Sequence, residues 1–105
     1  DQIGAPTWCR QIAEATARVV AARTDVGGTY TLSAGGETTW CGFARAIVAL
    51  AGIETVVQPI ATADYPTVAE RPRYSVLDGA RLARDCGISL PDWRDGLSRC
   101  MAERA

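Results

Sequence analysis

The sequence contains no histidine and no lysine, so all eleven of its basic side chains are arginine. Without an imidazole, the chain has no histidine to act as general base, metal ligand or triad member. Without a lysine amine, it has no Schiff-base former and no lysine for a tyrosine–lysine proton relay. We therefore predict that this chain contributes no catalytic residue of its own.

Paired cysteines are missing as well, because the four that are present form no Cys-x-x-Cys motif: Cys9, Cys41, Cys86 and Cys100. We interpret them as small buried apolar side chains in a reducing cytoplasm. Their spacing does not match a zinc knuckle, so we predict no metal. A disulfide stays open at this point, because pairing depends on distance in three dimensions.

Charge and hydropathy exclude two classes of partner. The net charge is −1 and the arginines are spread along the chain, so we predict no nucleic-acid surface. No apolar run approaches the roughly 18 residues of a membrane span, so we predict no membrane partner. The start, Asp1 to Gly4, resembles no signal peptide, and we expect a cytoplasmic protein. It lacks an initiator Met, so we expect a fragment, a recombinant piece or a processed product.

Hydrophobic periodicity predicts four helices. The first is capped by Thr7, and the second begins after Thr38 or Thr39 and stops at Gly52. A short third helix runs from Asp78 to Cys86, and the fourth starts at 90–92. Their expected apolar faces are Trp8, Ile12, Ala15, Val19 and Ala22 in the first, Trp40, Phe43, Ala44, Ile47 and Ala51 in the second, and Trp93, Leu97, Cys100 and Met101 in the fourth.

Two segments rich in β-branched residues, 29–33 and 55–60, are predicted to be strands. Two strands make a poor independent sheet, so we expect them to pair with or pack beside something outside this chain. The connection 61–76 carries Arg71, Pro72 and Arg73. A loop of that length in a compact domain is often functional.

Four stretches in this order resemble the C-terminal third of dTDP-4-dehydrorhamnose reductases, members of the extended short-chain dehydrogenase/reductase group. The resemblance covers essentially the whole chain. The stretches are Asp1-Gln2-x-Gly4-x-Pro6-Thr7, Gly28-Thr29-Tyr30-x-Leu32-x-Ala34-Gly35-Gly36-Glu37-Thr38-x-Trp40, Arg71-Pro72-x-Tyr74-Ser75-x-Leu77-Asp78 and Leu90-Pro91-Asp92-Trp93.

The resemblance implies an α/β fold: residues 1–105 form one small C-terminal substrate-binding domain of about four helices and two or three short strands. We expect the N-terminal Rossmann domain that binds NADPH or NADH in the parent enzyme to lie outside this chain. The chain itself contains no Gly-x-x-Gly-x-x-Gly and no Tyr-x-x-x-Lys. We therefore expect no cofactor here. The expected partners are a dTDP-sugar, the missing Rossmann domain and, through an orphaned interface, a second copy in a homo-oligomer.

The resemblance also implies where the sugar nucleotide binds. Related enzymes carry an arginine before proline near the substrate phosphates, which points to Arg71, because a guanidinium binds a diphosphate through two N–H donors. Arg73 is a second choice that could instead pair with Glu70 or Asp78. Trp40 and Trp8 either stack on the ligand or pack in the core. Thr7 lies at the expected cleft boundary or simply caps a helix.

Two further interpretations stay open. The turn at Gly35-Gly36 is either a small anion-binding turn or a tight turn that needs positive φ. The whole chain is either the substrate side of a reductase, not catalytic alone, or a non-catalytic regulatory or protein-interaction module. The second alternative rests on a resemblance to the regulatory subunit of methionine adenosyltransferase, which uses this scaffold for partner contact.

Overall fold

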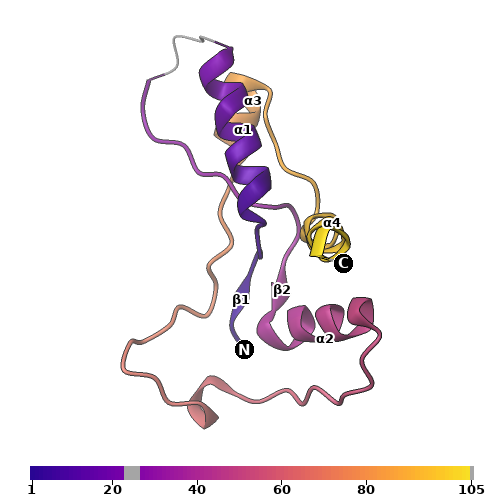
Figure 1. The fold of residues 1–105 in the computed structure, drawn as a ribbon. Coiled ribbons are helices and arrows are strands. Elements are labelled where there is room, and N and C mark those ends of the chain that lie inside the picture. The colour runs from indigo at the N-terminus through magenta and orange to yellow at the C-terminus, as the bar shows by residue number, and fades with distance from the viewer. Residues whose placement is uncertain (23–26, 105) are drawn as a thin grey trace.

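The fold is a small α/β arrangement of four helices and two short strands, seen in a computed structural model that describes residues 1–22 and 27–104 (Figure 1). It confirms the predicted fold class. In chain order the elements are β1 (Ile3–Gly4), α1 (Cys9–Ala21), β2 (Thr38–Thr39), α2 (Trp40–Ala51), the 3-10 turn η1 (Thr62–Asp64), α3 (Ala80–Cys86) and α4 (Trp93–Arg104). None of the helices in these residues is long and apolar enough to cross a membrane.

The elements gather at two levels (Figure 1). Helices α1 and α3 lie side by side at one end, and the β1–β2 pair leads to α2 at the other. Helix α4 packs against α2. The long connection from α2 to α3 wraps around the outside of β1 and carries η1.

The two strands are not the ones predicted. Segments 29–33 and 55–60 form no ladder with another strand, because β-propensity alone does not supply a partner. Segment 29–33 instead packs Tyr30 and Leu32 against the helices. In the second segment, the Val57 carbonyl accepts hydrogen bonds from the Arg45 guanidinium at 3.1 and 3.3 Å.

Strand β1 is hydrogen-bonded on both of its edges. On one edge, β1 pairs antiparallel with β2, with Ile3 opposite Thr39. On the other edge, the Ile3 N–H donates to the Arg73 carbonyl at 2.8 Å, and the Ser75 N–H donates to the Ile3 carbonyl at 2.9 Å. Residues 73–75 therefore run beside β1 in parallel, with Tyr74 opposite Ile3.

The main apolar core lies between α1, α3 and the segments beside them. Its buried members are Ala15, Leu82 and Ile88, with Val19, Tyr30, Leu32, Cys86 and Leu90 packed around them. The predicted apolar face of α1 is confirmed at Ala15 and Val19, which pack in this core, but Gln11 rather than Ile12 is buried one turn earlier. Gln11 is 3% exposed and faces Gly96 of α4, whereas Ile12 lies at the surface.

A second core connects α2 with α4. Trp93 is 3% exposed, which confirms its predicted core position. The Phe43 ring meets Trp93 edge-on at a centroid distance of 6.1 Å. The Arg94 guanidinium covers the Trp93 ring at 4.6 Å, so α4 is anchored by aromatic packing.

The Gly35-Gly36 turn docks onto the residues that precede α4. The Gly35 N–H donates to the Pro91 carbonyl at 2.9 Å, and the Trp93 N–H donates to the Gly35 carbonyl at 3.0 Å. Gly36 has φ of +73°, and a Cβ there would overlap the Asp92 carboxylate. The structure thus supports the tight-turn interpretation, since an acidic side chain of the protein faces the turn.

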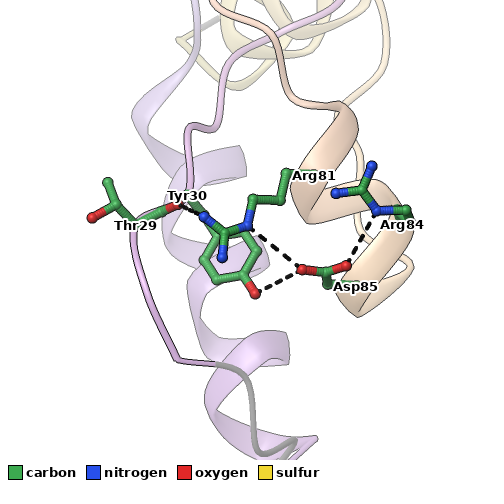
Figure 2. Close-up of polar contacts among 5 residues, drawn as sticks. All are labelled: Thr29, Tyr30, Arg81, Arg84 and Asp85. Carbon is green, nitrogen blue, oxygen red and sulfur yellow. Dashed lines mark hydrogen bonds and ion pairs between the residues drawn. The ribbon is translucent and has the colours of Figure 1, made fainter.

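Helix α3 is fastened to segment 29–32 by a polar cluster around Asp85 (Figure 2). The Tyr30 hydroxyl donates to Asp85 at 2.9 Å, and Arg84 pairs with the other carboxylate oxygen at 3.4 Å. The Arg81 guanidinium lies over the Tyr30 ring at 4.7 Å and donates to the Thr29 carbonyl at 3.2 Å. This cluster holds an irregular segment against the helix that covers it.

The expected helix ends are mostly confirmed. Thr39 accepts from the Gly42 N–H at 3.0 Å as the N-cap of α2. Gly52 and Gly87 end α2 and α3 in the left-handed conformation. The Asp78 carboxylate accepts from the Ala80 N–H at 2.9 Å, although Gly79 occupies the N-cap position of α3.

Two local predictions are wrong. Thr7 does not cap α1, because its hydroxyl donates to the Ala5 carbonyl and accepts from the Ala34 N–H, both at 2.9 Å. Cys9 is exposed rather than buried, because it lies on the outer face of α1, and the other three cysteines are half-buried. All four are free thiols.

The chain exposes far more surface than a compact monomer of its size. Its accessible surface is 7602 Å² for 11.2 kDa, whereas a compact monomer of that mass exposes about 5,700 Å². The radius of gyration is 16.1 Å against an expected value of about 13 Å. No residue of α2 is buried, although nearly all are apolar. Large exposed apolar side chains cluster from the end of α2 onward: Leu50, Ile53, Val56, Ile60 and Val68.

We expect Gly36→Ala to destabilise the chain by more than the about 1–2 kcal/mol that left-handed backbone costs an alanine, because it also displaces Asp92. Gly52→Ala is the matched control, since Gly52 has φ of +67° and open space around it. Gly27→Ala, with neither constraint, should change stability by less than about 0.5 kcal/mol. Urea unfolding measures all three, and equal losses at Gly36 and Gly52 would contradict the docking role of Asp92.

We expect the contribution of the Tyr30–Asp85 bond to stability to be greatest near neutral pH. The bond lowers the pKa of Asp85 below its ordinary 3.8, despite partial burial. Partial burial first, and then the same bond, raise the pKa of Tyr30 above its ordinary 10.0. The contribution is therefore lost as pH falls through the lowered pKa of Asp85 or rises through the raised pKa of Tyr30.

The corresponding measurement is the melting temperature of the unsubstituted chain and of Tyr30→Phe from pH 3 to pH 11. The difference should be largest between pH 5 and 9 and shrink at both extremes. Tyr65→Phe is the control, because the Tyr65 hydroxyl makes no hydrogen bond within the part of the chain that the structure describes. A pH-independent difference for Tyr30→Phe would rule out the linkage.

Candidate functional site

A cleft of about 1150 Å³ opens between three segments of the chain. Residues 1–6, including β1, form its base. Residues 38–44, from β2 into the first turns of α2, form one wall. Parts of the connection between positions 57 and 75, including η1, form the opposite wall. The cleft therefore lies where the long connection returns to the sheet.

Trp40 lies on the wall formed by residues 38–44, at the first position of α2. The Thr39 cap fixes the start of α2, so the indole is presented at the mouth of the cleft. Trp40 is 71% exposed, which shows that the core-packing interpretation is wrong. The ring meets Phe43 edge-on at 6.5 Å, and Phe43 in turn meets Trp93. A row of aromatic rings thus connects the exposed indole to the core.

Arg71 lines the opposite wall of the same cleft, followed by Pro72. Its side chain makes no hydrogen bond or ion pair within the described part of the chain. Asp1 is the acidic residue that lines the cleft, and its carboxylate is already bound to Thr62. The Arg71 guanidinium is thereby left free to receive an anion.

The N-terminal segment ties η1 to the base of the cleft. The Asp1 carboxylate accepts from the Thr62 N–H at 2.9 Å and from the Thr62 hydroxyl. The Gln2 amide donates to the same hydroxyl at 3.2 Å. These bonds hold η1, in the first half of the long connection, against the base of the cleft, and they add Gln2 and Thr62 to the polar residues that line it.

The structure separates the five predicted site residues. Trp40 and Arg71 line the cleft together, whereas Arg73, Trp8 and Thr7 do not. The Arg73 carbonyl is bound by Ile3, and its side chain is exposed. The Trp8 ring is approached by the guanidinium groups of Arg10 and Arg99 at 5.4 and 6.0 Å. The Thr7 hydroxyl joins the start of α1 to Ala34.

One side-chain bond beside the cleft was not predicted from the sequence. The Tyr74 hydroxyl donates to the Glu37 carboxylate at 2.7 Å. This bond, together with partial burial and the nearby negative charge, raises the pKa of Tyr74 above its ordinary 10.0. Neither residue belongs to a periodic pattern, and they are far apart in the sequence, so no local signal marks them as partners.

The chemistry of the cleft is suited to binding. It offers one guanidinium for a phosphate group, one exposed indole for a planar ring, and amide and hydroxyl groups for a sugar. In residues 1–22 and 27–104 no three of the cysteine, aspartate and glutamate side chains gather to hold a metal ion. The cleft thus combines one cationic group, one exposed aromatic ring and several uncharged polar groups.

A nicotinamide dinucleotide does not fit the residues present. Its pyrophosphate requires a glycine-rich turn between a parallel strand and a helix. The Gly35-Gly36 turn is the nearest approach to one, and the Asp92 carboxylate faces it. That negative charge would repel a phosphate, so we assign no step of a reaction to a cofactor held by these residues.

Comparison with known proteins identifies the family. The RmlD substrate binding domain family matches residues 1–105. A dTDP-4-dehydrorhamnose reductase from Burkholderia thailandensis is 40% identical over 98% of this chain and 40% of its own length.

Two solved structures of dTDP-4-dehydrorhamnose reductases are also similar. The Clostridium acetobutylicum protein superimposes with a TM-score of 0.92 at 31% identity over 99% of this chain. The Bacillus anthracis protein, determined in complex with NADP, gives 0.90 at 30% identity over 100%. Each match covers 36% of the solved chain.

The fold and the cleft are thus those of a substrate-binding domain. The chain belongs to the RmlD substrate binding domain family. It spans 36–40% of the length of the relatives it matches.

We expect Thr39→Ala to destabilise the chain by about 1 kcal/mol, because it removes the side-chain cap of α2. Thr39→Ser retains the hydroxyl and should lose markedly less. Urea unfolding followed by far-ultraviolet circular dichroism gives both values. Equal losses in the two variants would show that the cap does not fix the start of the helix that carries Trp40.

Proposed function

We propose that this chain is the sugar-nucleotide-binding part of a cytoplasmic dTDP-4-dehydrorhamnose reductase and is not catalytic alone. The parent enzyme reduces dTDP-6-deoxy-L-lyxo-4-hexulose to dTDP-L-rhamnose with NADPH or NADH. The observation that carries the proposal is the placement of Arg71 and Trp40 on facing walls of one cleft, in a member of this family.

Each wall has a distinct role in this proposal. The Arg71 guanidinium binds the diphosphate through paired N–H donors, and Pro72 restricts the backbone beside it. The Trp40 indole stacks on the thymine or on the sugar ring. Gln2 presents its amide oxygen to the sugar hydroxyl groups, and Thr62, whose hydroxyl is bound by Asp1 and Gln2, holds that amide in place.

The excess apolar surface supports the presence of a Rossmann partner. Helix α2 and the residues after it expose apolar side chains that a folded enzyme would cover. More than half of the length of each relative lies outside the segment that matches this chain, and that remainder is long enough to form a Rossmann domain. A homo-oligomer through the same surface is the competing arrangement, and sedimentation of the isolated chain distinguishes the two.

The direct test is a fusion of this chain to the N-terminal part of the Burkholderia thailandensis relative in place of that protein's matching segment. We expect NADPH oxidation that depends on the 4-keto sugar nucleotide. Arg71→Ala should raise KM by about 10- to 100-fold, because a hydrogen-bonded charge on the diphosphate is lost. Arg73→Ala is the matched control, two residues away and outside the cleft, and should change KM little.

NADPH binding by the fusion reports whether the Rossmann part is folded. A fusion that binds NADPH but neither binds nor reduces the sugar nucleotide would contradict the proposal. Equal effects of Arg71→Ala and Arg73→Ala would contradict the assignment of Arg71. Recovery of one stoichiometric protein partner from cells, with no sugar-nucleotide binding, would instead favour the regulatory module.

A further inference from the structure

We propose that Tyr74 is a positioning residue: its hydrogen bond to Glu37 forms a latch that holds Arg71 across the cleft from Trp40. This inference rests on the proposed function, because it assigns the latch a role in binding the nucleotide diphosphate. The latch is defined as the Tyr74 hydroxyl, the Glu37 carboxylate and the bond of 2.7 Å between them.

The latch joins the two walls that carry the binding groups. Glu37 directly precedes β2 and stands three residues before Trp40. Tyr74 stands three residues after Arg71. Of the side-chain hydrogen bonds in the described residues, this is the one that connects segment 71–75 to segment 37–40. It therefore sets the spacing between the guanidinium and the indole more directly than any other side-chain contact there.

The main chain on both sides of Tyr74 is hydrogen-bonded to Ile3 of β1, so the backbone that carries the latch tyrosine is held in place. Ile3 exchanges hydrogen bonds with Arg73 and Ser75 at 2.8 and 2.9 Å, and the Ser75 hydroxyl donates to the Ile3 carbonyl at 3.2 Å. These bonds fix segment 73–75 along β1. They do not reach the β2 side of the sheet, where Glu37 and Trp40 lie.

Arg71 gains from such a device because its own side chain makes no hydrogen bond or ion pair in the described part of the chain, so that only its backbone can be held in place. It lies at the end of a long irregular connection, where ordering on binding costs conformational entropy. A loop held in its binding conformation avoids part of that cost. The latch thus acts on affinity for the sugar nucleotide rather than on the chemical step.

The test compares Tyr74→Phe, Glu37→Ala, Glu37→Gln and the double variant Tyr74→Phe/Glu37→Ala in the fusion described above. We expect Tyr74→Phe and Glu37→Ala each to raise KM for the sugar nucleotide by about three- to tenfold, with kcat changed by less than about twofold. Glu37→Gln retains a carbonyl acceptor and should stay near the unsubstituted value. The double variant should be no worse than either single variant.

Tyr30→Phe is the matched control. It also removes a tyrosine hydroxyl from a carboxylate, at 2.9 Å, but in the cluster around Asp85 and away from the cleft (Figure 2). It should lower stability without changing KM. A rise in KM with Tyr30→Phe equal to that with Tyr74→Phe would show a general loss of stability and would overturn the latch.

A second measurement separates failure of the latch from failure of the proposed function. The backbone amides of residues 70 and 71 in the 105-residue chain, which precede the segment fixed by Ile3, report order through 15N relaxation. Tyr74→Phe should make them more mobile, and Tyr30→Phe should not. Unchanged order would overturn the latch whatever the kinetics show. Greater mobility in a chain whose fusion binds no sugar nucleotide would support the latch and contradict the proposed function.

Discussion

The main chain of Ile3 is the point on which the site depends, because it is hydrogen-bonded on both edges of β1. One edge pairs with Thr39, immediately before Trp40, and the other with Arg73 and Ser75, just after Arg71. Without this pairing, the long connection would have no fixed path past the start of α2. The pairing of two short strands therefore brings segments that are far apart in the sequence together around one cleft.

The small buried core of the fold is consistent with its proposed role. Its buried apolar side chains are few and some are small, and α2 has none that is buried. The accessible surface is larger than that of a compact monomer of this mass, and the excess is about a quarter of the total. A domain with so small a core gains stability when a large apolar partner covers it. Under the proposed function, docking of a Rossmann domain would cover the exposed apolar side chains of α2 and of the connection that follows it.

Local chemistry was predictable from the sequence, and long-range pairing was not. Thr39 and Gly52 were found because a cap and a left-handed stop depend on a few neighbouring residues. The strands were misplaced because β-propensity does not reveal a partner, and Ile3 finds its partners at Thr39 and Tyr74. Arg71 was singled out by loop length and resemblance. Tyr74 and Glu37 were missed as a pair, because no periodicity connects them.

The central claim is that Arg71 and Trp40 hold a sugar nucleotide between them. A crystal structure of the fusion with dTDP tests it most directly, because it locates the diphosphate without reference to activity. We predict that the Arg71 guanidinium lies within hydrogen-bond distance of the diphosphate oxygens and that the Trp40 indole stacks on the thymine or borders the space for the sugar. A diphosphate bound elsewhere, with Arg71 pointing into solvent, would contradict it.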